Sequence, residues 1–184
     1  MEYQETAIPG VWVLTPKVFE DPRGYFMETW READFNQHIG HEVHFVQDNQ
    51  SLSSRGVLRG LHYQKGNSSQ AKLVRVIQGT VVDVAVDLRK DSPTFGQHVM
   101  VELSEDNRKQ LFIPRGFAHG FQVLSEKAVF TYKVDNRYAP EDECSIRYDD
   151  PALGIDWPIK AADEVHLSEK DLRHAVSFDA AEKF

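Results

Sequence analysis

Cysteine is nearly absent from the sequence, because Cys144 is the single cysteine among 184 residues. One cysteine excludes an intrachain disulfide and a zinc site built from clustered cysteines, and it fits a reducing compartment. Cys144 lies in "EDECS", where neighbouring carboxylates disfavour the thiolate form. The sequence therefore does not favour a cysteine nucleophile.

Long apolar runs are also missing. No stretch approaches the roughly 18–20 apolar residues that a membrane-spanning helix requires, and the N-terminus "MEYQETAIPG" has no basic start followed by an apolar segment. We therefore expect a cytoplasmic chain with no secretory signal and no membrane association. With 41% hydrophobic and 27% charged residues, the chain can bury one sizeable core, so we expect a single domain over residues 1–184.

Positive charge is scarce, since 21 Lys and Arg residues stand against 29 Asp and Glu residues and give a formal net charge of -8. A nucleic-acid-binding protein neutralises phosphates with a basic face, so this balance argues against that class. It does not exclude one anionic small molecule, which would require cations gathered locally. Clustered arginines and lysines are therefore informative in this sequence.

Alternating apolar residues recur through the middle of the sequence and predict β-strands. In "TVVDVAVDL" (80–88) four apolar residues fall on one face and both aspartates on the other, and "FGQHVMVEL" (95–103) repeats the alternation. "KAVFTYKV" (127–134) is rich in β-branched and aromatic residues, and "AKLVRVIQG" (71–79) ends on a turn glycine. Short strands with turn signals between them predict a mainly β fold, an antiparallel sandwich or barrel.

Helix signals are few and lie outside this central region. Residues 28–40, "ETWREADFNQHIG", contain helix formers and end on a glycine. Residues 167–175, "LSEKDLRHA", begin with Ser168 as an expected N-cap and have Asp171 three residues later. We therefore expect a few short helices flanking the strands. The last residues, "DAAEKF" (179–184), are expected to fray.

Two stretches interrupt the strand pattern in the same way. "RGLHYQ" (59–64) and "IPRGFAHGFQVL" (113–124) each combine Arg-Gly with a later histidine and aromatic neighbours. Glycine weakens a strand unless a bulge or a close backbone approach requires it. Both stretches are therefore expected to open onto a ligand.

The histidines do not predict a metal site. Metal-binding barrels of the cupin type offer His-x-His, a glutamate and a later histidine, whereas the first motif here is His62, Tyr63 and Gln64. One ligand from that strand is too few for a site of three or four ligands, even if His119 contributes another. We therefore expect the chemistry to depend on side chains, with no metal and no cofactor.

Four polar residues are candidates for acid–base chemistry, and each has a structural alternative. His62 is suited to be a general base if a carboxylate fixes its tautomer, and Asp171 is the candidate carboxylate, although a helix-capping role also explains Asp171. Lys72 either is a solvated charge at a strand edge or points inward, where its ammonium would stabilise an enolate. Tyr132 either packs in the core or faces a pocket and delivers a proton from the side opposite the base.

Two arginines that precede glycine, Arg23 and Arg59, are candidates for binding phosphate. A planar guanidinium beside a glycine can clamp phosphate oxygens with two hydrogen bonds. Isolated arginines are common on protein surfaces, so each is weak evidence alone. The polar run "QDNQ" (47–50) inside a β-like segment indicates an edge that hydrogen-bonds a nucleotide or a sugar.

Several longer blocks carry a resemblance to a known family and together run from about residue 21 to residue 171. The blocks are "DPRGYFMETW", "FVQDNQSLSSRGVLRGLHYQ", "KLVRVIQGTVVDVAVDLR", "SPTFG", "IPRGFAHGF", "YKVDNRYAPEDECSIRYDDPALGIDWP" and "LSEKD". Their order and spacing resemble those of the dTDP-4-dehydrorhamnose 3,5-epimerase family. None of the blocks is a short common motif, so the resemblance is specific.

This resemblance implies a metal-free, cupin-like antiparallel jelly-roll β-sandwich that works as a homodimer, with N-terminal strands reaching across to the partner. It implies an isomerase of dTDP-rhamnose biosynthesis that converts dTDP-4-dehydro-6-deoxy-D-glucose to dTDP-4-dehydro-L-rhamnose without a cofactor. A 4-ketone acidifies the hydrogens on both neighbouring carbons, C3 and C5, so one base and one acid can invert both in turn. Because the substrate is a diphosphate anion, local arginines in an acidic chain are then explained.

The family pattern also assigns roles to individual residues. By that pattern His62 is the base held by Asp171, Lys72 stabilises the enolate, and Tyr132 is the acid. Tyr138 matches the aromatic residue that stacks on thymine. The other substrate contacts that carry over are Arg23, Glu28, Gln47, Asp48, Asn49, Arg59, His119, Glu143 and Lys170.

Three alternatives stay open on the sequence alone. Relatives within the family invert only C3 or only C5 of a related keto sugar, and the presence of Tyr132 favours the double epimerase. A non-catalytic module would bind the nucleotide sugar and make no use of His62. A cupin oxygenase or isomerase would need a metal ion.

Overall fold

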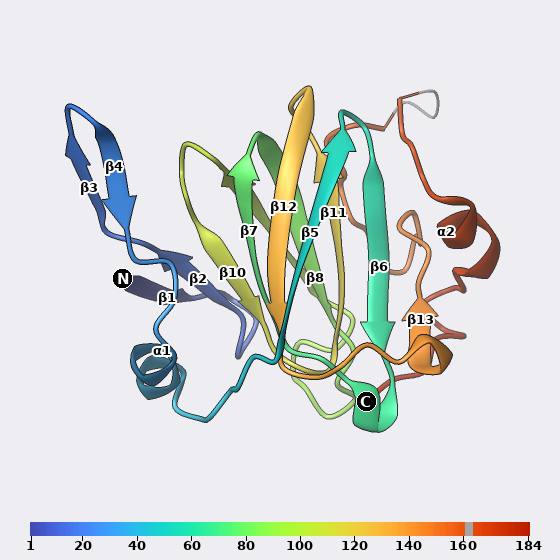
Figure 1. Ribbon diagram of the computed structural model, residues 1–184. Helices are drawn as coiled ribbons and strands as arrows, with labels where there is room; N and C mark the ends of the chain where they lie inside the picture. The colour runs from blue at the N-terminus through green and yellow to red at the C-terminus, as the bar shows by residue number, and fades with distance from the viewer. Residues whose placement is uncertain (161–163) are drawn as a thin grey trace.

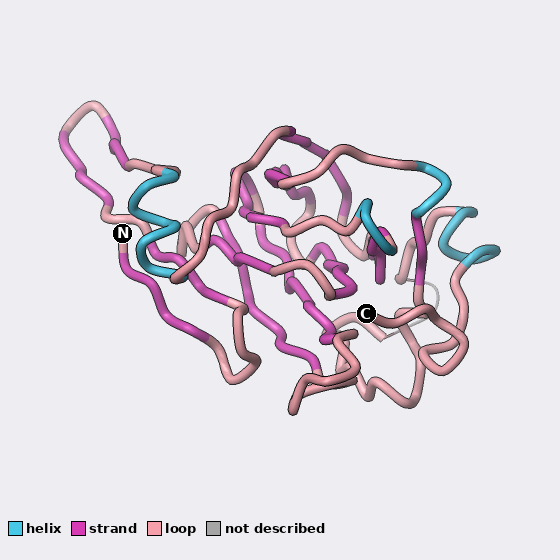
Figure 2. The backbone as a smooth tube through the Cα atoms, turned by 90° about the horizontal axis from the view of Figure 1, so that it is seen from below, coloured by secondary structure: helices cyan, strands magenta, loops and turns pink. Residues whose placement is uncertain are grey.

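The computed structural model describes residues 1–160 and 164–184 as two β-sheets, a separate hairpin and short helices (Figure 1, Figure 2). The first sheet has the spatial order β1 (Glu2–Glu5), β2 (Trp12–Thr15), β10 (Gln110–Ile113), β7 (Lys72–Gln78), β12 (Lys127–Val134) and β5 (Gln47–Ser54). The second has the order β13 (Glu143–Ser145), β6 (Leu58–Gln64), β11 (Phe117–Val123), β8 (Thr80–Asp87) and β9 (His98–Ser104). The remaining elements are the hairpin strands β3 (Val18–Asp21) and β4 (Gly24–Met27), the helices α1 (Glu32–Ile39) and α2 (Glu169–His174), and two 3₁₀ helices, η1 (Gly66–Ser68) and η2 (Pro140–Asp142).

Strand pairing in both sheets is antiparallel throughout the named strands. Neighbours in a sheet are mostly distant in sequence, as in the order β10-β7-β12, which crossover connections between two layers produce. The predicted mainly β, antiparallel, cupin-like sandwich is therefore confirmed.

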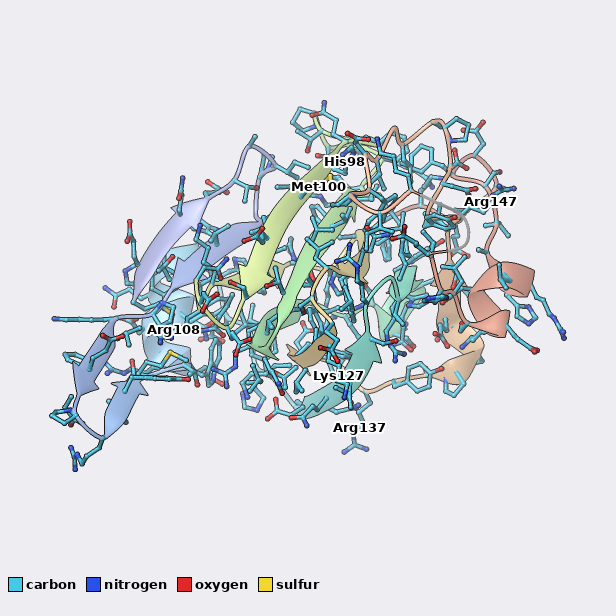
Figure 3. The ribbon with its side chains drawn as sticks, turned by 90° about the horizontal axis from the view of Figure 1, so that it is seen from above. His98, Met100, Arg108, Lys127, Arg137 and Arg147 are labelled. Atoms are coloured by element: carbon cyan, nitrogen blue, oxygen red, sulfur yellow. The ribbon has the colours of Figure 1, made fainter. Side chains whose placement is uncertain are left out.

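The hairpin of β3 and β4 belongs to neither sheet and extends away from both on the N-terminal side (Figure 1). Arg108, labelled in Figure 3, connects the hairpin to the body. Its guanidinium carbon lies 4.2 Å from the centre of the Tyr25 ring, and its Nη1 lies 3.6 Å from Glu20 Oε1. The aromatic side chains of Phe19, Tyr25 and Phe26 are nevertheless exposed. The hairpin therefore presents an apolar surface that the described part of the chain does not cover.

The two predicted helices form, and each is shorter than its predicted range. Helix α1 buries Phe35 against the outer face of the first sheet and ends at Gly40, whose φ of +80° lets the chain turn out of the helix. Helix α2 begins after Ser168, whose Oγ accepts a hydrogen bond from the Asp171 backbone N–H at 3.1 Å, as predicted. No helix in residues 1–160 or 164–184 is long and apolar enough to cross a membrane.

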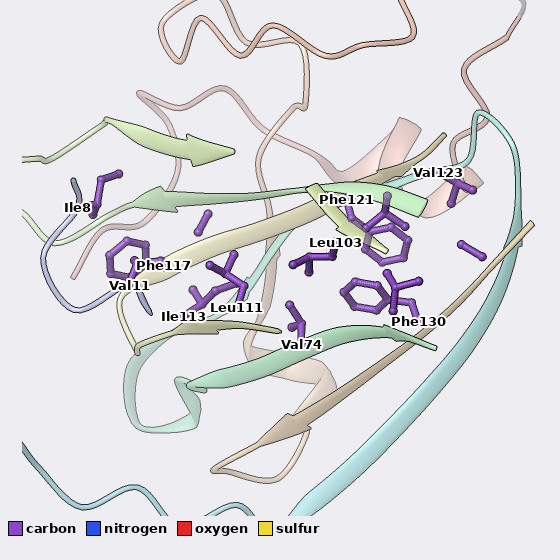
Figure 4. Packing of buried hydrophobic residues seen from close by; sticks show 14 residues of the cluster. Ile8, Val11, Val74, Leu103, Leu111, Ile113, Phe117, Phe121, Val123 and Phe130 are labelled. Atoms are coloured by element: carbon purple, nitrogen blue, oxygen red, sulfur yellow. The ribbon is translucent and has the colours of Figure 1, made fainter. Parts of the chain in front are cut away.

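The main hydrophobic core lies between the two sheets and takes side chains from both (Figure 4). A second buried cluster lies on the outer face of the second sheet, where the C-terminal part of the chain covers it. Members of the main core include Val74, Val76, Leu111, Ile113 and Phe130 from the first sheet and Val81, Ala85, Leu103, Phe117, Phe121 and Val123 from the second. The central strands of the second sheet are therefore buried on both faces.

Strand β8 has the two faces that the alternation pattern predicts, and both of them are buried. The apolar face predicted for residues 80–88 packs under the C-terminal segment, and the aspartate face points into the interior, where Asp83 and Asp87 are both fully buried. Burial raises the pKa of Asp87, but hydrogen bonds from Arg89, Ser92 and Thr94 outweigh it and lower the pKa to about 2. An alternating acidic face is thus an interior polar layer here, because β8 is an inner strand of a covered sheet.

The C-terminal residues 179–184 also differ from expectation, because they are docked and do not fray. The Phe184 N–H donates to the Leu88 carbonyl at 3.0 Å, and the Lys90 N–H donates to the Phe184 carbonyl at 2.8 Å. Phe178 and Ala181 are buried in the outer cluster. These strand-like hydrogen bonds and apolar contacts supply the ordering that a free tail lacks.

Candidate active site

A cavity of about 450 Å³ lies between the sheets, and strands of both sheets line it. Its walls combine polar side chains with aromatic rings, a combination that suits a ligand with both polar and apolar parts. The lining residues are Gln47, Asn49, Gln50, Ser51, Arg59, His62, Tyr63, Gln64, Gln70, Lys72, His119, Phe121, Phe130, Tyr132, Tyr138 and Glu143.

Two glycines allow β6 and β11 to approach closely at the cavity wall. A Cβ atom on Gly60 would lie 2.5 Å from the Cα of Gly120, and a Cβ on Gly120 would lie 2.8 Å from the Arg59 carbonyl oxygen. Gly60 also has a φ of +139°, which residues with a side chain rarely adopt. The predicted close backbone approach is therefore present, and it occurs where the register between the two strands shifts.

His62 and Asp171 form a hydrogen-bonded pair, although 109 residues separate them in sequence. His62 Nε2 donates to Asp171 Oδ1, which leaves His62 Nδ1 with the free lone pair. The Asp171 side chain is 5% exposed, and its Oδ2 accepts a further hydrogen bond from Ser168 Oγ at 2.9 Å. Asp171 therefore contacts both His62 and Ser168, the N-cap residue of α2, through separate carboxylate oxygens, whereas the cap itself is made by the Ser168 hydroxyl.

The Asp171 carboxylate is ionised around neutral pH. Burial raises its pKa, but the hydrogen bond and charge of His62 and the hydroxyl of Ser168 outweigh burial and lower the pKa below its usual value. A carboxylate in contact with an imidazole stabilises the imidazolium that forms when the imidazole accepts a proton. This pair is therefore suited to general base catalysis.

Lys72 and Tyr132 reach the cavity from the first sheet, whereas His62 reaches it from the second. Burial lowers the pKa of Lys72 to about 8, and the charges of Asp83 and Glu143 act in the opposite direction. Burial raises the pKa of Tyr132, so its phenol keeps its proton at neutral pH. A base on one wall therefore faces a cation and a phenolic acid on the other.

His119 lies directly opposite His62 in the pairing of β11 with β6. Its Nε2 donates to the Asp83 carboxylate, with distances of 2.9 and 3.1 Å to the two oxygens. Burial lowers the pKa of His119, and Asp83 partly opposes this. Two histidine–aspartate pairs thus lie side by side in the cavity wall.

The part of the cavity near β13 has an aromatic ring and paired charges. Glu143 accepts hydrogen bonds from both Tyr138 Oη and Lys170 Nζ, so this tyrosine and lysine meet on one carboxylate. Burial raises the pKa of Glu143, but these two donors outweigh it and keep the carboxyl ionised. Tyr138 is half exposed and lines the cavity, so its ring is accessible to a planar ligand.

On the β5 and β6 side, the cavity presents hydrogen-bonding groups. Gln47 Nε2 donates to Asn49 Oδ1 at 2.9 Å, and Arg59 Nε donates to Ser53 Oγ at 3.1 Å. Because the hydrogen bond to Ser53 uses Nε, the two terminal nitrogens of Arg59 can donate to another acceptor. A guanidinium is suited to bind phosphate oxygens.

Comparison with known proteins identifies the family. The sequence pattern that describes dTDP-4-dehydrorhamnose 3,5-epimerases matches residues 5–179. The chain belongs to the dTDP-4-dehydrorhamnose 3,5-epimerase family. It is 56% identical over 167 residues to the dTDP-4-dehydrorhamnose 3,5-epimerase of Salmonella typhimurium, which covers 91% of this chain and 90% of the relative.

Two solved structures of epimerases are closely similar in fold. The dTDP-4-dehydrorhamnose 3,5-epimerase of Elizabethkingia anophelis has a TM-score of 0.93 and 53% identity, with 97% of each chain covered. A dTDP-6-deoxy-D-glucose-3,5-epimerase from Legionella pneumophila, solved in complex with dTDP-4-keto-L-rhamnose, has a TM-score of 0.93 and 47% identity, covering 98% of this chain and 94% of that one.

Lys170 and Asp171 do not line the cavity themselves, but they bond to the lining residues Glu143 and His62. Three other residues expected from the epimerase family pattern neither line the cavity of this chain nor bond to a side chain that lines it. Asp48 makes an ion pair with Lys133 at 2.8 Å and lines a neighbouring groove. Arg23, at the turn of the β3–β4 hairpin, has an 89% exposed side chain and contacts Asp21. Glu28 makes an ion pair with Arg31 at 2.6 Å. One chain therefore brings together most, but not all, of the expected epimerase residues.

The structure also adds residues in or next to the cavity that the sequence analysis did not single out. Phe121 and Phe130 stack with ring centres 4.1 Å apart and supply the apolar part of the wall, and Asp83 holds His119 from behind. Phe121 lies within a stretch already predicted to open onto a ligand, so that stretch was a usable signal. Asp83 gave none, because an aspartate in an alternating strand resembles a solvent-facing residue.

Proposed function

We propose that the protein inverts C3 and C5 of dTDP-4-dehydro-6-deoxy-D-glucose and so produces dTDP-4-dehydro-L-rhamnose. The observation that carries the proposal is the placement of the His62–Asp171 pair on one cavity wall and of Lys72 and Tyr132 on the other. A hydrogen next to a ketone is acidic because its removal gives an enolate. Inversion requires removal of that hydrogen on one face and return of a proton on the opposite face.

Each side chain has one role in this reaction. His62 Nδ1 takes the proton from carbon, and the Asp171 carboxylate stabilises the resulting imidazolium. The Lys72 ammonium stabilises the negative charge that develops on the ketone oxygen. Tyr132 donates a proton to the other face of the carbon, and exchange with water then returns His62 and Tyr132 to their starting states. General acid and base groups each contribute about 10²- to 10⁴-fold to such rates.

The polar ends of the cavity fit a nucleoside diphosphate sugar. Arg59 is placed to bind phosphate, Tyr138 to stack on thymine, and the Glu143–Lys170 pair to contact the nucleotide or sugar. His119, Gln47 and Asn49 supply further hydrogen bonds, as the family pattern implies. We also place the reaction in the cytoplasm, which agrees with an unpaired cysteine.

We further propose that the protein is a homodimer in which the β3–β4 hairpin reaches the partner. The exposed fractions of Phe19, Tyr25 and Phe26 are 53%, 57% and 70%, values that are unusual for three aromatic residues on one ribbon. Burial of this surface against a second copy removes it from water. The same contact brings Arg23 and Glu28 to the cavity of the partner subunit. Neither residue lines the cavity of its own chain.

Proton NMR of the keto sugar in heavy water tests the reaction. The expected result is protein-dependent incorporation of deuterium at both C3 and C5, with product formation unaffected by chelators. Deuterium at one carbon only would identify a mono-epimerase, and none with retained dTDP binding would identify a binding module. Loss of activity with a chelator would instead indicate a metal-dependent enzyme.

Mixing two impaired variants tests the partner contact. His62→Asn lacks the base and Arg23→Ala lacks the hairpin cation. If the hairpin acts on the partner, a mixed dimer contains one site with wild-type His62 and wild-type Arg23, and mixing restores part of the activity. If mixing restores nothing while the mixed dimer forms, the hairpin serves its own chain or none.

A further inference from the structure

Asp83 is a buried carboxylate next to the cavity that the mechanism above does not use. It lies on the inner face of β8, between Val101 of β9 and Phe121 of β11 in the strand register, and it has no exposed surface. In the described part of the chain, His119 is the one side chain that donates a hydrogen bond to it. A buried carboxylate with so few donors costs free energy, which calls for a functional reason.

The first consequence of Asp83 concerns the tautomer of His119. A carboxylate is only an acceptor, so His119 Nε2 must carry the hydrogen in this contact. In a neutral imidazole, Nδ1 then has the lone pair. His119 Nδ1 makes no hydrogen bond within residues 1–160 and 164–184, and His119 lines the cavity. The ring therefore offers an acceptor to a ligand hydroxyl.

The second consequence concerns the charge of Lys72. Lys72 lies on β7 of the facing sheet, and desolvation favours its neutral form. Asp83 is the largest opposing influence, followed by Glu143 of β13. The other ionisable groups that line the same cavity are His62 and Arg59 of β6, His119 of β11, Tyr132 of β12, and Tyr63 and Tyr138.

We propose that Asp83 is a positioning residue of the epimerase reaction: it holds His119 in the tautomer whose Nδ1 accepts a hydrogen bond from a sugar hydroxyl, and it supplies the buried negative charge that keeps Lys72 an ammonium ion. The proposal rests on the proposed function for its catalytic part. Asp83 acts through two other side chains and does not touch the substrate.

Two substitutions separate these effects. Asp83→Asn removes the charge but keeps an oxygen that can accept from His119 Nε2, whereas Asp83→Ala removes both. Loss of the Asp83 charge removes the largest influence that opposes desolvation of Lys72, so the pKa of Lys72 is expected to fall, by about one unit for a neighbouring opposite charge. A fall from about 8 to near 7 leaves kcat almost unchanged at pH 6 and lowers it about fivefold at pH 8. KM changes little, because the nucleotide contacts are intact.

Asp87→Asn is the matched control. Asp87 lies on the same strand, is also fully buried, and binds Arg89, Ser92 and Thr94 away from the cavity. This variant is expected to lose stability, but its kcat should depend on pH above 7 in the same way as that of the wild type. If the kcat of Asp83→Asn depends on pH above 7 as that of the wild type does, the charge role of Asp83 is wrong. The same conclusion follows if Asp87→Asn shifts this pH dependence as far as Asp83→Asn does.

Measurements on the substrate-free wild-type protein keep the proposal testable if a variant fails to fold. Nitrogen-15 NMR at pH 7 should find His119 neutral, with the hydrogen on Nε2, and a hydrogen on Nδ1 would overturn the tautomer role. Titration of the Lys72 amine by carbon-13 NMR should have its midpoint near pH 8 in the wild-type protein, and a midpoint well below 7 would overturn the charge role. Where Asp83→Asn folds, the midpoint of that variant should lie at lower pH. These readouts need no turnover, so they can fail while the heavy-water experiment succeeds, or the reverse.

Discussion

The charge of Asp171 is the part of the proposed mechanism whose contribution can be calculated from the structure. Its carboxylate contacts His62, is 5% exposed and does not line the cavity. Unit charges about 4 Å apart at an effective dielectric constant of about 20 interact by about 4 kcal/mol. Asp171→Asn removes this stabilisation of the imidazolium, so kcat should fall about 10³-fold, while KM stays within about threefold of wild type. Deuterium incorporation at C3 and C5, followed by NMR, measures both quantities.

Ser168→Ala provides the control for the structural role of Asp171. It removes the hydroxyl that caps α2 and donates to Asp171 Oδ2, but it keeps the carboxylate against His62. Loss of a helix cap costs about 1 kcal/mol, which lowers the Tm of a chain of this size by about 2–4 °C, and kcat should fall less than tenfold. If Asp171→Asn keeps kcat within tenfold of wild type, the carboxylate does not stabilise the imidazolium and the reasoning is refuted.

Three further predictions concern acid, stability and assembly. Tyr132→Phe removes the group that donates a proton to the second face of the carbon. Deuterium should therefore still exchange into the substrate faster than the carbon is inverted. If the variant loses deuterium exchange as well, Tyr132 takes part in removal of the proton. Asp87 has a folded-state pKa of about 2, which is below its unfolded value. The ionised carboxylate therefore stabilises the fold by about 2.5 kcal/mol above about pH 4, and this stabilisation is lost as the pH falls toward 2. In denaturant titrations, Asp87→Asn should abolish this pH dependence of stability. Arg108→Ala removes the guanidinium that stacks on Tyr25 and should raise the dimer dissociation constant about fivefold in sedimentation experiments, whereas an unchanged constant would show that the hairpin needs no such support.

The fold was largely predictable because strand alternation is a local signal. The strand over 127–134 forms with the predicted ends, and those over 71–79, 80–88 and 95–103 form with shifted ends. What the alternation could not indicate is the number of covered faces. Both faces of β8 are buried because the C-terminal segment, about 90 residues later in the chain, packs on its outer face. The docking of residues 179–184 is part of this contact between distant residues, so no local pattern predicts it.

The candidate site was predictable where glycine and histidine mark a local break in a strand. The Arg-Gly and histidine pattern of β6 and β11 indicated the cavity wall, and the close approach of Gly60 and Gly120 explains the pattern. Contacts between distant residues had no local signal. The residues alone offered Asp171 as a candidate partner of His62 and Arg23 as a candidate phosphate ligand, and each kept a structural alternative. The family resemblance assigned the two roles, and within one chain the structure shows the His62–Asp171 contact but leaves Arg23 exposed.

Two histidines with carboxylate partners face one cavity, and burial assigns them different chemistry. The His119 side chain is 9% exposed and its pKa is lowered by desolvation, so it resists protonation and suits a neutral acceptor. The His62 side chain is 29% exposed, so an imidazolium formed there keeps contact with the cavity as well as with Asp171. In the proposed mechanism, the same pair of residue types therefore acts as a proton-accepting base at one position and as a fixed hydrogen-bond acceptor at the other. If His119 were the base, its buried imidazolium would lie against the Lys72 ammonium, and the repulsion would oppose the proton transfer that the reaction requires.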